Sequence, residues 1–488
     1  MRTINLPPYA PTLMESTRAI GYSLEAAIAD IIDNSITAQA STINIKFFPV
    51  GQPYISILDN GEGMTGDELN VAMQYGSKNP NEERDSNDLG RFGLGLKTAS
   101  LSQCRKLTVI SLKNGELSGR RWDIDYVLQT GEWSLIILED DEIKQMPQFS
   151  ELSTYGNGTI VVWQNLDRLI IGEIDFVTSF GLKMDIVREH LSLVFHRFLS
   201  GEQGLKKIDI FINNNNVKAT DPFLAKKSIQ LMDDESIIIR EQSVIVRPYI
   251  LPHTSKLSES EIKELGGKDG LRRKQGFYVY RNKRLLVWAT WFRLMRQGEL
   301  SKLARVQVDI PNSLDDLWAL DIKKSTAIPP EEIRKNLGNI IEKISEGSKR
   351  TWTYRGKKET DDSKIHIWNR IRTRQNGIIY RINRDYPLLE KLQVISVEAK
   401  QLLEQLLLQI EGNLPLNSLY VDLISDERVE NEVKISEDAT IDILTQLLSG
   451  CRNNFEREEL LERLVVTEPF LEYKEVINCK FKGAKQNE

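Results

Sequence analysis

The sequence predicts an α+β protein of several domains that ends in a helical region. Its 488 residues exceed what one ordinary hydrophobic core accommodates. Strand-like and helical patterns alternate up to about residue 330, and mainly helical patterns follow. We therefore expect four segments: an α+β domain over residues 1–165, a connector helix over 166–204, a second α+β domain over 205–330 and a helical region over 331–488.

The composition excludes several classes of protein. Lys and Arg total 64 against 70 Asp and Glu, so a globally basic nucleic-acid coat is excluded while local basic patches remain open. The three cysteines, Cys104, Cys451 and Cys479, have no CxxC spacing, which argues against a disulfide framework and a zinc site. No apolar run approaches the roughly 20 residues that span a bilayer. We expect a soluble, cytoplasmic protein without a membrane segment.

The order of predicted helices and strands in the first segment is typical of helices packed on one sheet. A helix is expected up to Ala40, followed by the strands "TINIKFF" and "YISILD". A glycine-rich stretch leads into a helix near Leu94, and "KLTVISL" and "GTIVVW" are expected to be further strands. These elements predict a mostly antiparallel sheet that shares one pair of layers with the helices.

The first helix carries an unusual polar stripe. In "AIADIIDNSITA", residues 27–38, a spacing of about 100° per residue gathers Asp30, Asp33, Asn34 and Thr37 on one arc. These residue types are poor in helix interiors. The stripe is either a solvated face of an amphipathic helix or part of a site.

Two glycine-rich stretches follow. Asp59 ends the strand "YISILD", and Gly61 and Gly63 come directly after it; this is either a plain turn or a place where a flat ligand approaches the backbone. In that case Asp59 could accept a hydrogen bond from an exocyclic amine. The stretch "GRFGLGLK" precedes a helix, whose N-terminus can face phosphate oxygens, although the Walker order is absent.

The order and spacing of these stretches, completed by "GNGTIVVW", resemble the ATP-binding domain of the GHKL superfamily: gyrase, the heat-shock-90 chaperones, histidine kinases and MutL-like proteins. The resemblance covers roughly residues 15–165. It implies an α/β sandwich of the Bergerat type, with ATP and Mg²⁺ as cofactors.

The resemblance also implies roles for individual residues. Asn34 matches the Mg²⁺ ligand, Asp59 the adenine-reading carboxylate, and Thr159 the residue that supports this carboxylate. Lys97 either contacts phosphate or only supports the phosphate loop. Gly61, Gly63 and Met64 match the wall of the adenine pocket. The phosphate loop is matched by Gly90, Arg91, Phe92, Gly93, Leu94, Gly95 and Leu96. Residues 76–89 match the lid over bound ATP, with Ser77 and Lys78 at its edge.

The catalytic residues implied by the resemblance are one carboxylate and one lysine. Asp30 holds the position, one turn before Asn34, of the carboxylate that polarises the attacking water; that residue is usually a glutamate, one methylene longer. Because positioning dominates phosphoryl transfer, a retracted base predicts slow hydrolysis, which we expect to depend on dimerisation. In "LWALDIKKSTAIPP", Lys324 or else Lys323 is expected to reach the γ-phosphate.

Within the superfamily, the sequence is most similar to bacterial MORC-like and MutL-like ATPases. The pair "GFYVYRNKRLLVW" resembles a strand, arginine turn and strand of their transducer domain. All four histidines follow the nucleotide domain, which sets histidine kinases aside; His190 and His196 are expected to serve packing or local hydrogen bonds. Such bacterial relatives often sit beside restriction or antiphage genes.

Two functional classes stay open. In the first, an ATP-dependent homodimer closes as a clamp on DNA, in restriction, antiphage defence or repair, with basic runs such as "GLRRKQ", "RNKR" and "KRTWTYRGKK" on the phosphates. Each run is equally compatible with a solvated surface. In the second, the chain is a nucleotide-gated interaction module that recruits a partner nuclease, with little hydrolysis or DNA binding of its own.

Overall fold

The computed structural model describes most of the chain in two units. Described are residues 3–76, 95–230, 234–252, 256–266, 270–298, 301–318, 329–341, 367–372, 378–389, 397–414 and 436–482, apart from positions 5, 7, 20, 316, 385, 388, 452, 468 and 469. The first unit comprises residues 1–353 and the second residues 354–488. Each unit is described by itself below.

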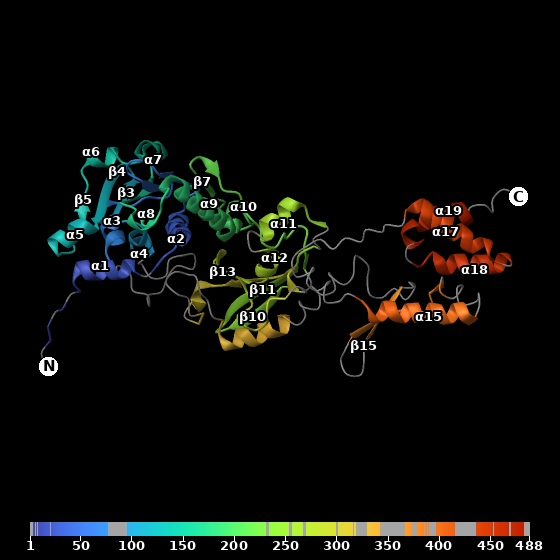
Figure 1. Ribbon diagram of the computed structural model, residues 1–488. Helices are drawn as coiled ribbons and strands as arrows, with labels where there is room; N and C mark the ends of the chain where they lie inside the picture. Colours follow the sequence, from blue (N-terminus) through green and yellow to red (C-terminus); the bar gives the residue numbers. More distant parts are fainter. Residues whose placement is uncertain are drawn as a thin grey trace. The chain divides into compact units, whose positions relative to one another are not determined.

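The first unit begins with a mixed sheet of eight strands in the order β5-β4-β3-β6-β2-β1-β7-β8 (Figure 1). Only β1 and β7 pair in parallel; the other neighbours are antiparallel. The last two strands come from the segment expected to open the second domain, yet they extend this sheet. The strands are β1 (Thr42–Phe48), β2 (Tyr54–Asp59), β3 (Lys106–Lys113), β4 (Glu116–Asp123), β5 (Ile136–Ile137), β6 (Gly158–Gln164), β7 (Asp209–Ile212) and β8 (Asn215–Asn216).

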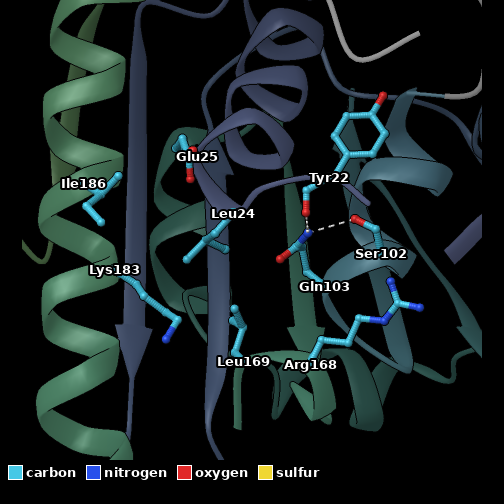
Figure 2. A pocket seen from close by; sticks show the side chains of 9 residues that line it. All are labelled: Tyr22, Leu24, Glu25, Ser102, Gln103, Arg168, Leu169, Lys183 and Ile186. Atoms are coloured by element: carbon cyan, nitrogen blue, oxygen red, sulfur yellow. Dashed lines mark hydrogen bonds between the residues drawn. The ribbon is translucent and has the colours of Figure 1, made fainter. Parts of the chain in front are cut away.

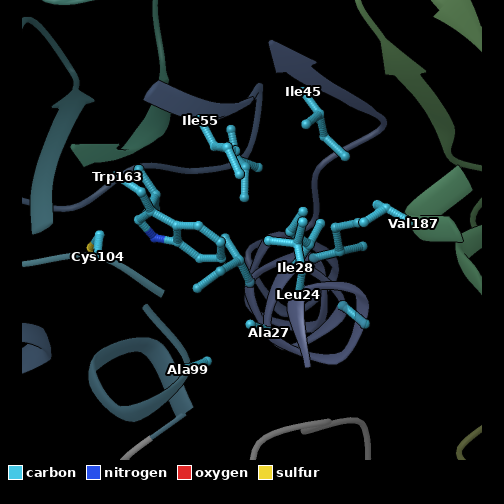
Figure 3. Close-up of a cluster of buried hydrophobic side chains, with 14 of the residues drawn as sticks. Leu24, Ala27, Ile28, Ile45, Ile55, Ala99, Cys104, Trp163 and Val187 are labelled. Carbon is cyan, nitrogen blue, oxygen red and sulfur yellow. The ribbon is translucent and has the colours of Figure 1, made fainter. Parts of the chain in front are cut away.

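Helices cover both faces of this sheet. The helices around it are α1 (Ala10–Arg18), α2 (Leu24–Thr37), α3 (Gly66–Met73), α4 (Gly95–Gln103), α5 (Ile124–Thr130), α6 (Asp140–Lys144), α7 (Phe149–Tyr155), α8 (Asp167–Ile170) and α9 (Phe176–Val194). Neighbouring residues of β6 show the two-faced pattern of a strand. Trp163 belongs to the main core with α2, α4 and α9 (Figure 3), whereas Val162 belongs to a smaller core with α6 and α7.

Helix α2 is buried on nearly all sides. Ser23 caps its start by accepting a hydrogen bond from the Ala26 N–H. Ile28 and Ile32 have no exposed surface, and burying each contributes about 1.5–3 kcal/mol. The polar stripe of this helix is solvated only in part: Asn34 and Thr37 are exposed, whereas Asp30 is 4% and Asp33 1% exposed. The carboxylates therefore need partners inside the protein.

The segment after β6 links the two sheets of the first unit. Helix α9 begins at an Asp175 cap, and α10 (His196–Ser200) follows it directly. Gly201 ends α10 in the left-handed conformation with φ of 66°, which glycine adopts without strain. His196 Nε2 lies 2.7 Å from the Tyr280 hydroxyl of the second sheet, a hydrogen bond of the kind expected for this histidine.

The second sheet of this unit has six strands. β10-β11-β14-β12-β13 form its path, and β9 pairs with β11; β12 and β14 are parallel. Its elements are β9 (Ile229–Gln230), β10 (Glu235–Ile239), β11 (Gln242–Ile250), α11 (Glu259–Gly266), α12 (Gly270–Arg273), β12 (Gly276–Arg281), β13 (Arg284–Thr290), β14 (Ala304–Ile310) and the 3₁₀ turn η4 (Asn312–Leu314). A helix over 331–341 packs its apolar side, including Ile333 and Leu337, into the core of this sheet.

The second unit is helical, with one hairpin that the sequence did not predict. β15 (Trp368–Arg372) and β16 (Ile378–Ile382) pair antiparallel. The helices are α15 (Val397–Gly412), α17 (Glu437–Ser449), α18 (Asn454–Leu464), η5 (Phe470–Tyr473) and α19 (Lys474–Lys482). Leu444, Leu464 and Phe470 form the centre of a small core among α17–α19. Among the helices described in either unit, none combines the length and apolar character needed to cross a membrane.

Candidate nucleotide site

A buried carboxylate lies at the end of β2. Asp59 is 6% exposed; its Oδ2 accepts a hydrogen bond from Ser35 Oγ at 2.8 Å and its Oδ1 one from the Gly61 N–H at 2.9 Å. Burial raises the pKa of Asp59, and the hydrogen bonds with Gly61 and Ser35 oppose that rise. The two hydrogen bonds hold the Asp59 carboxylate in one orientation, and its burial leaves little water around it.

The loop after Asp59 requires its glycines. Gly63 has φ of 71°, and an added Cβ would lie 2.2 Å from the Leu112 carbonyl oxygen. At Gly61 an added Cβ would lie 2.7 Å from the Ala38 carbonyl oxygen. Both contacts are closer than any Cβ tolerates, so the loop is fixed against β3 and the end of α2 by close backbone packing.

A hydroxyl network joins this loop to β3 and β6. The Met64 N–H donates to Ser111 Oγ at 2.7 Å, and Ser111 Oγ lies 3.0 Å from Thr159 Oγ1. Thr159 lies opposite Asp59 in the strand register, and its backbone hydrogen bond also opposes the raised pKa of Asp59. Asp59, Gly61, Gly63, Met64 and Thr159 are therefore brought together at one end of the first sheet.

Helix α2 holds Asp30 and Asn34 one turn apart in different surroundings. Asp30 Oδ2 accepts a hydrogen bond from the Tyr22 hydroxyl at 3.2 Å and faces the start of α4, since an added Cβ on Gly95 would lie 3.8 Å from it. Asn34 is exposed, and its amide forms no hydrogen bond with the described residues. A neutral amide oxygen without a partner is a suitable ligand for Mg²⁺, which usually keeps several waters.

Asp33 points toward the second sheet. Its Oδ1 lies 3.3 Å from Nε of Arg284, the first residue of β13, and the two side chains are 1% and 6% exposed. The Arg284 guanidinium also lies over the Phe195 ring, 5.6 Å from its centre. Nearby, burial lowers the pKa of His190 to about 3, and the Arg284 charge adds to this effect. A buried ion pair therefore joins the helix of Asn34 to the other sheet.

Part of the expected phosphate end lies outside the described residues: Ser77, Lys78, Gly90, Arg91, Phe92, Gly93, Leu94, Lys323 and Lys324. Gly95 and Leu96 begin α4. Lys97 follows them, 1% exposed, and its Nζ donates to the Ala72 carbonyl oxygen at 2.9 Å. Burial lowers the pKa of Lys97 to about 8. This contact supports α3 from α4.

Three residues of this site were missed by the sequence analysis: Ser35, Ser111 and Tyr22. Ser35 offered a signal, because its hydroxyl lies among the apolar residues of α2, on the side that faces β2. Ser111 and Tyr22 gave none, since a serine in a strand and a tyrosine before a helix are common. Ser35 contacts Asp59, 24 positions away, and Ser111 contacts Thr159, 48 positions away, whereas Tyr22 contacts Asp30, 8 positions away.

One of the basic runs proposed for DNA does not form a solvated patch. Within "RNKR", Arg281 and Arg284 are 4% and 5% exposed. Arg281 Nε donates to both carboxylate oxygens of Asp315, at 2.7 and 2.9 Å, and Arg284 pairs with Asp33. These two arginines are structural, so this expectation was wrong for them. The run at 349–358 lies outside the described residues.

Comparison with known proteins identifies the first part of the chain. Residues 22–159 match the sequence model of the family described as "Histidine kinase-, DNA gyrase B-, and HSP90-like ATPase". This range contains the buried Asp59, the glycine loop, and the helix with Asp30 and Asn34.

The matches to individual relatives are short. The chain is 32% identical over 97 residues to the DNA mismatch repair protein MutL of Thermosipho melanesiensis, a match that spans 20% of this chain and 17% of that protein. It is 30% identical over 91 residues to the ATPase morc-1 of Caenorhabditis elegans, spanning 18% of this chain and 10% of that protein. The chain thus covers less than a fifth of the length of these relatives. Residues 22–159 form a GHKL ATPase domain.

Proposed function

We propose that this chain binds ATP with Mg²⁺, hydrolyses it slowly, and uses ATP binding to control a homodimer that acts on DNA. The observation that carries the proposal is the buried Asp59 beside a loop that admits only glycine, within the range that matches the ATPase family. Asp59 would accept a hydrogen bond from the adenine amine. Gly61, Gly63, Met64 and Thr159 would surround the base.

The phosphate end of the proposed site follows from α2. Asn34 would hold Mg²⁺ through its exposed amide oxygen, and the ion would neutralise phosphate charge. Asp30 would orient the attacking water. The phosphates would meet the loop over residues 90–96 under the lid, with Ser77 and Lys78 at its edge, and Lys324 or Lys323 would contact the γ-phosphate. Lys97 would support the loop rather than bind phosphate, given its bond to Ala72.

Binding and hydrolysis are tested separately. Calorimetry with a non-hydrolysable ATP analogue and Mg²⁺ should show binding by the wild type and none by Asp59→Asn, because the amide cannot accept from both Ser35 and Gly61 and also read the base. Phosphate release should be slow in the wild type and absent in Asp30→Ala. A wild type without affinity for the analogue refutes the proposal, whereas equal turnover in Asp30→Ala refutes only the role of Asp30.

Action on DNA rests on the relatives alone. One is named a DNA mismatch repair protein, and the sequence resemblance extends the context to restriction and antiphage defence. Light scattering should show dimers with the ATP analogue, and gel shifts at low to moderate salt should show DNA binding that depends on it. If dimers form without DNA binding, the chain is instead a nucleotide-gated module that recruits a partner nuclease.

A further inference from the structure

Tyr22 is fixed at both ends directly before α2. Its ring belongs to the main core and is 7% exposed. Its hydroxyl donates to Asp30 Oδ2 at 3.2 Å, and its carbonyl oxygen accepts a hydrogen bond at 3.0 Å from Nε2 of Gln103, the last residue of α4 (Figure 2). Gln103 is itself buried, so the phenol has little freedom to move away from Asp30.

The carboxylate of Asp30 lies near both this phenol and the start of α4. It is 4% exposed, and a Cβ added at Gly95 would lie 3.8 Å from its Oδ2. A carboxylate on a one-carbon stem reaches less far than glutamate, and rotation about its bonds changes where its oxygens point. A hydrogen-bond donor on one carboxylate oxygen favours one orientation of the carboxylate.

We propose that Tyr22 is a positioning residue for Asp30, holding the short carboxylate in the orientation that aligns the attacking water. The inference rests on the proposed ATPase function and deepens it. Phosphoryl transfer depends mainly on positioning, so a fixed hydrogen bond to the base changes turnover more than nucleotide affinity. The Tyr22 hydroxyl donates to the proposed base and its carbonyl oxygen accepts from Gln103, so we expect its effect on turnover.

The surroundings of Tyr22 offer a matched control. Tyr22 borders a cavity of about 240 Å³ that is also lined by Leu24 and Glu25 of α2 and by Ile186 of α9 (Figure 2). Ile186 is 46% exposed and belongs to the opposite wall of this cavity. Ile186→Ala therefore alters the cavity without altering the contact with Asp30.

The first test is Tyr22→Phe in the full chain. The ring keeps its packing and only the hydroxyl is lost, so we expect kcat to fall about tenfold, the effect of one hydrogen bond to a charged group, with KM within about twofold of wild type. Ile186→Ala should leave both constants unchanged. An unchanged kcat in Tyr22→Phe, or a fall matched by Ile186→Ala, overturns the inference.

The second test separates positioning from packing. In Asp30→Glu the longer side chain brings its carboxylate past the phenol, so the hydroxyl no longer aligns it and instead crowds it. Tyr22→Phe should then leave kcat unchanged or raise it. A tenfold fall in this background as well means that Tyr22 acts by packing and overturns the inference. A wild type without ATP binding or turnover refutes the proposed function, and the inference with it.

Discussion

The ion pair between Asp33 and Arg284 gives the most quantitative prediction. Arg284→Met removes the guanidinium but keeps an unbranched stem that can pack on Phe195. The variant leaves the Asp33 carboxylate, 1% exposed, without this cation. Because a buried charge that loses its partner is strongly unfavourable, we expect the first unit to lose stability.

The magnitude follows from the distance and the burial. At 3.3 Å and an effective dielectric constant of about 20, the gross attraction of two unit charges is about 5 kcal/mol. Desolvation of both groups offsets much of this in the wild type, but removal of one partner leaves the other group's desolvation uncompensated. Breaking such a pair typically costs about 3–5 kcal/mol. At about 2–4 °C per kcal/mol, the melting temperature should fall by roughly 10 °C.

A double-mutant cycle measures this pair in the full chain. Wild type, Arg284→Met, Asp33→Asn and the double variant are melted while circular dichroism is recorded, and the first transition is compared. Each single variant removes one member of the ion pair and keeps the charge of the other, whereas the double variant removes both charges. We therefore expect the double variant to recover at least half of the loss caused by Arg284→Met.

Arg281 is the matched control, because it lies at the other end of the same hairpin turn and pairs with Asp315 instead. Arg281→Met should also destabilise the protein, yet its effect should simply add to that of Asp33→Asn. If Arg284→Met and Asp33→Asn are additive as well, the two side chains do not interact in solution and the reasoning fails.

Three further predictions concern the nucleotide domain. Ser35→Ala removes a 2.8 Å hydrogen bond to the buried carboxylate at the end of β2, so affinity for the ATP analogue should fall about tenfold in calorimetry; unchanged affinity would contradict this. The pKa of Lys97 is about 8 when folded against an ordinary 10.5, so the unfolded chain binds more protons between these values. Urea unfolding should show stability rising from pH 8 toward 10 in wild type, and a smaller rise in Lys97→Met. Gly63→Ala adds a Cβ 2.2 Å from the Leu112 carbonyl, and should lower the melting temperature more than Gly51→Ala, which has φ of 68° but open space.

The adenine end of the candidate site could be predicted from sequence because its parts are local. Asp59, Gly61 and Gly63 lie within five positions, and a strand end followed by glycines restricts the backbone wherever it occurs. The structure shows why each glycine is required: a backbone carbonyl oxygen, of Ala38 for Gly61 and of Leu112 for Gly63, occupies the space that a Cβ would need. The supporting hydroxyl of Ser111 lies 48 positions before Thr159, and no spacing rule connects them.

The burial of the α2 carboxylates could not be predicted in the same way. Helical periodicity places Asp30 and Asp33 on a polar arc, and a polar arc usually faces water. Their burial depends on what packs there. For Asp33 this is Arg284, separated from it by 251 positions and carried by another sheet. The same distance explains why the sequence of "RNKR" predicts a surface run, because a charge pattern alone does not reveal the partners of its side chains.

The contacts of α2 link its ends to different parts of the first unit. Asp30 contacts Tyr22, Asn34 faces solvent and Asp33 pairs with Arg284 of the second sheet. Because a helix moves as a rigid element, a ligand that shifts Asn34 also shifts the neighbouring Asp33, whose buried charge cannot easily lose its cation. The β12–β13 hairpin should then follow the helix. This coupling between nucleotide binding and the hairpin does not require the two lysines at 323 and 324. Its free energy cannot exceed that of the ion pair between Asp33 and Arg284. Arg284→Met should therefore weaken nucleotide-dependent protection of the hairpin in hydrogen exchange even where nucleotide binding persists.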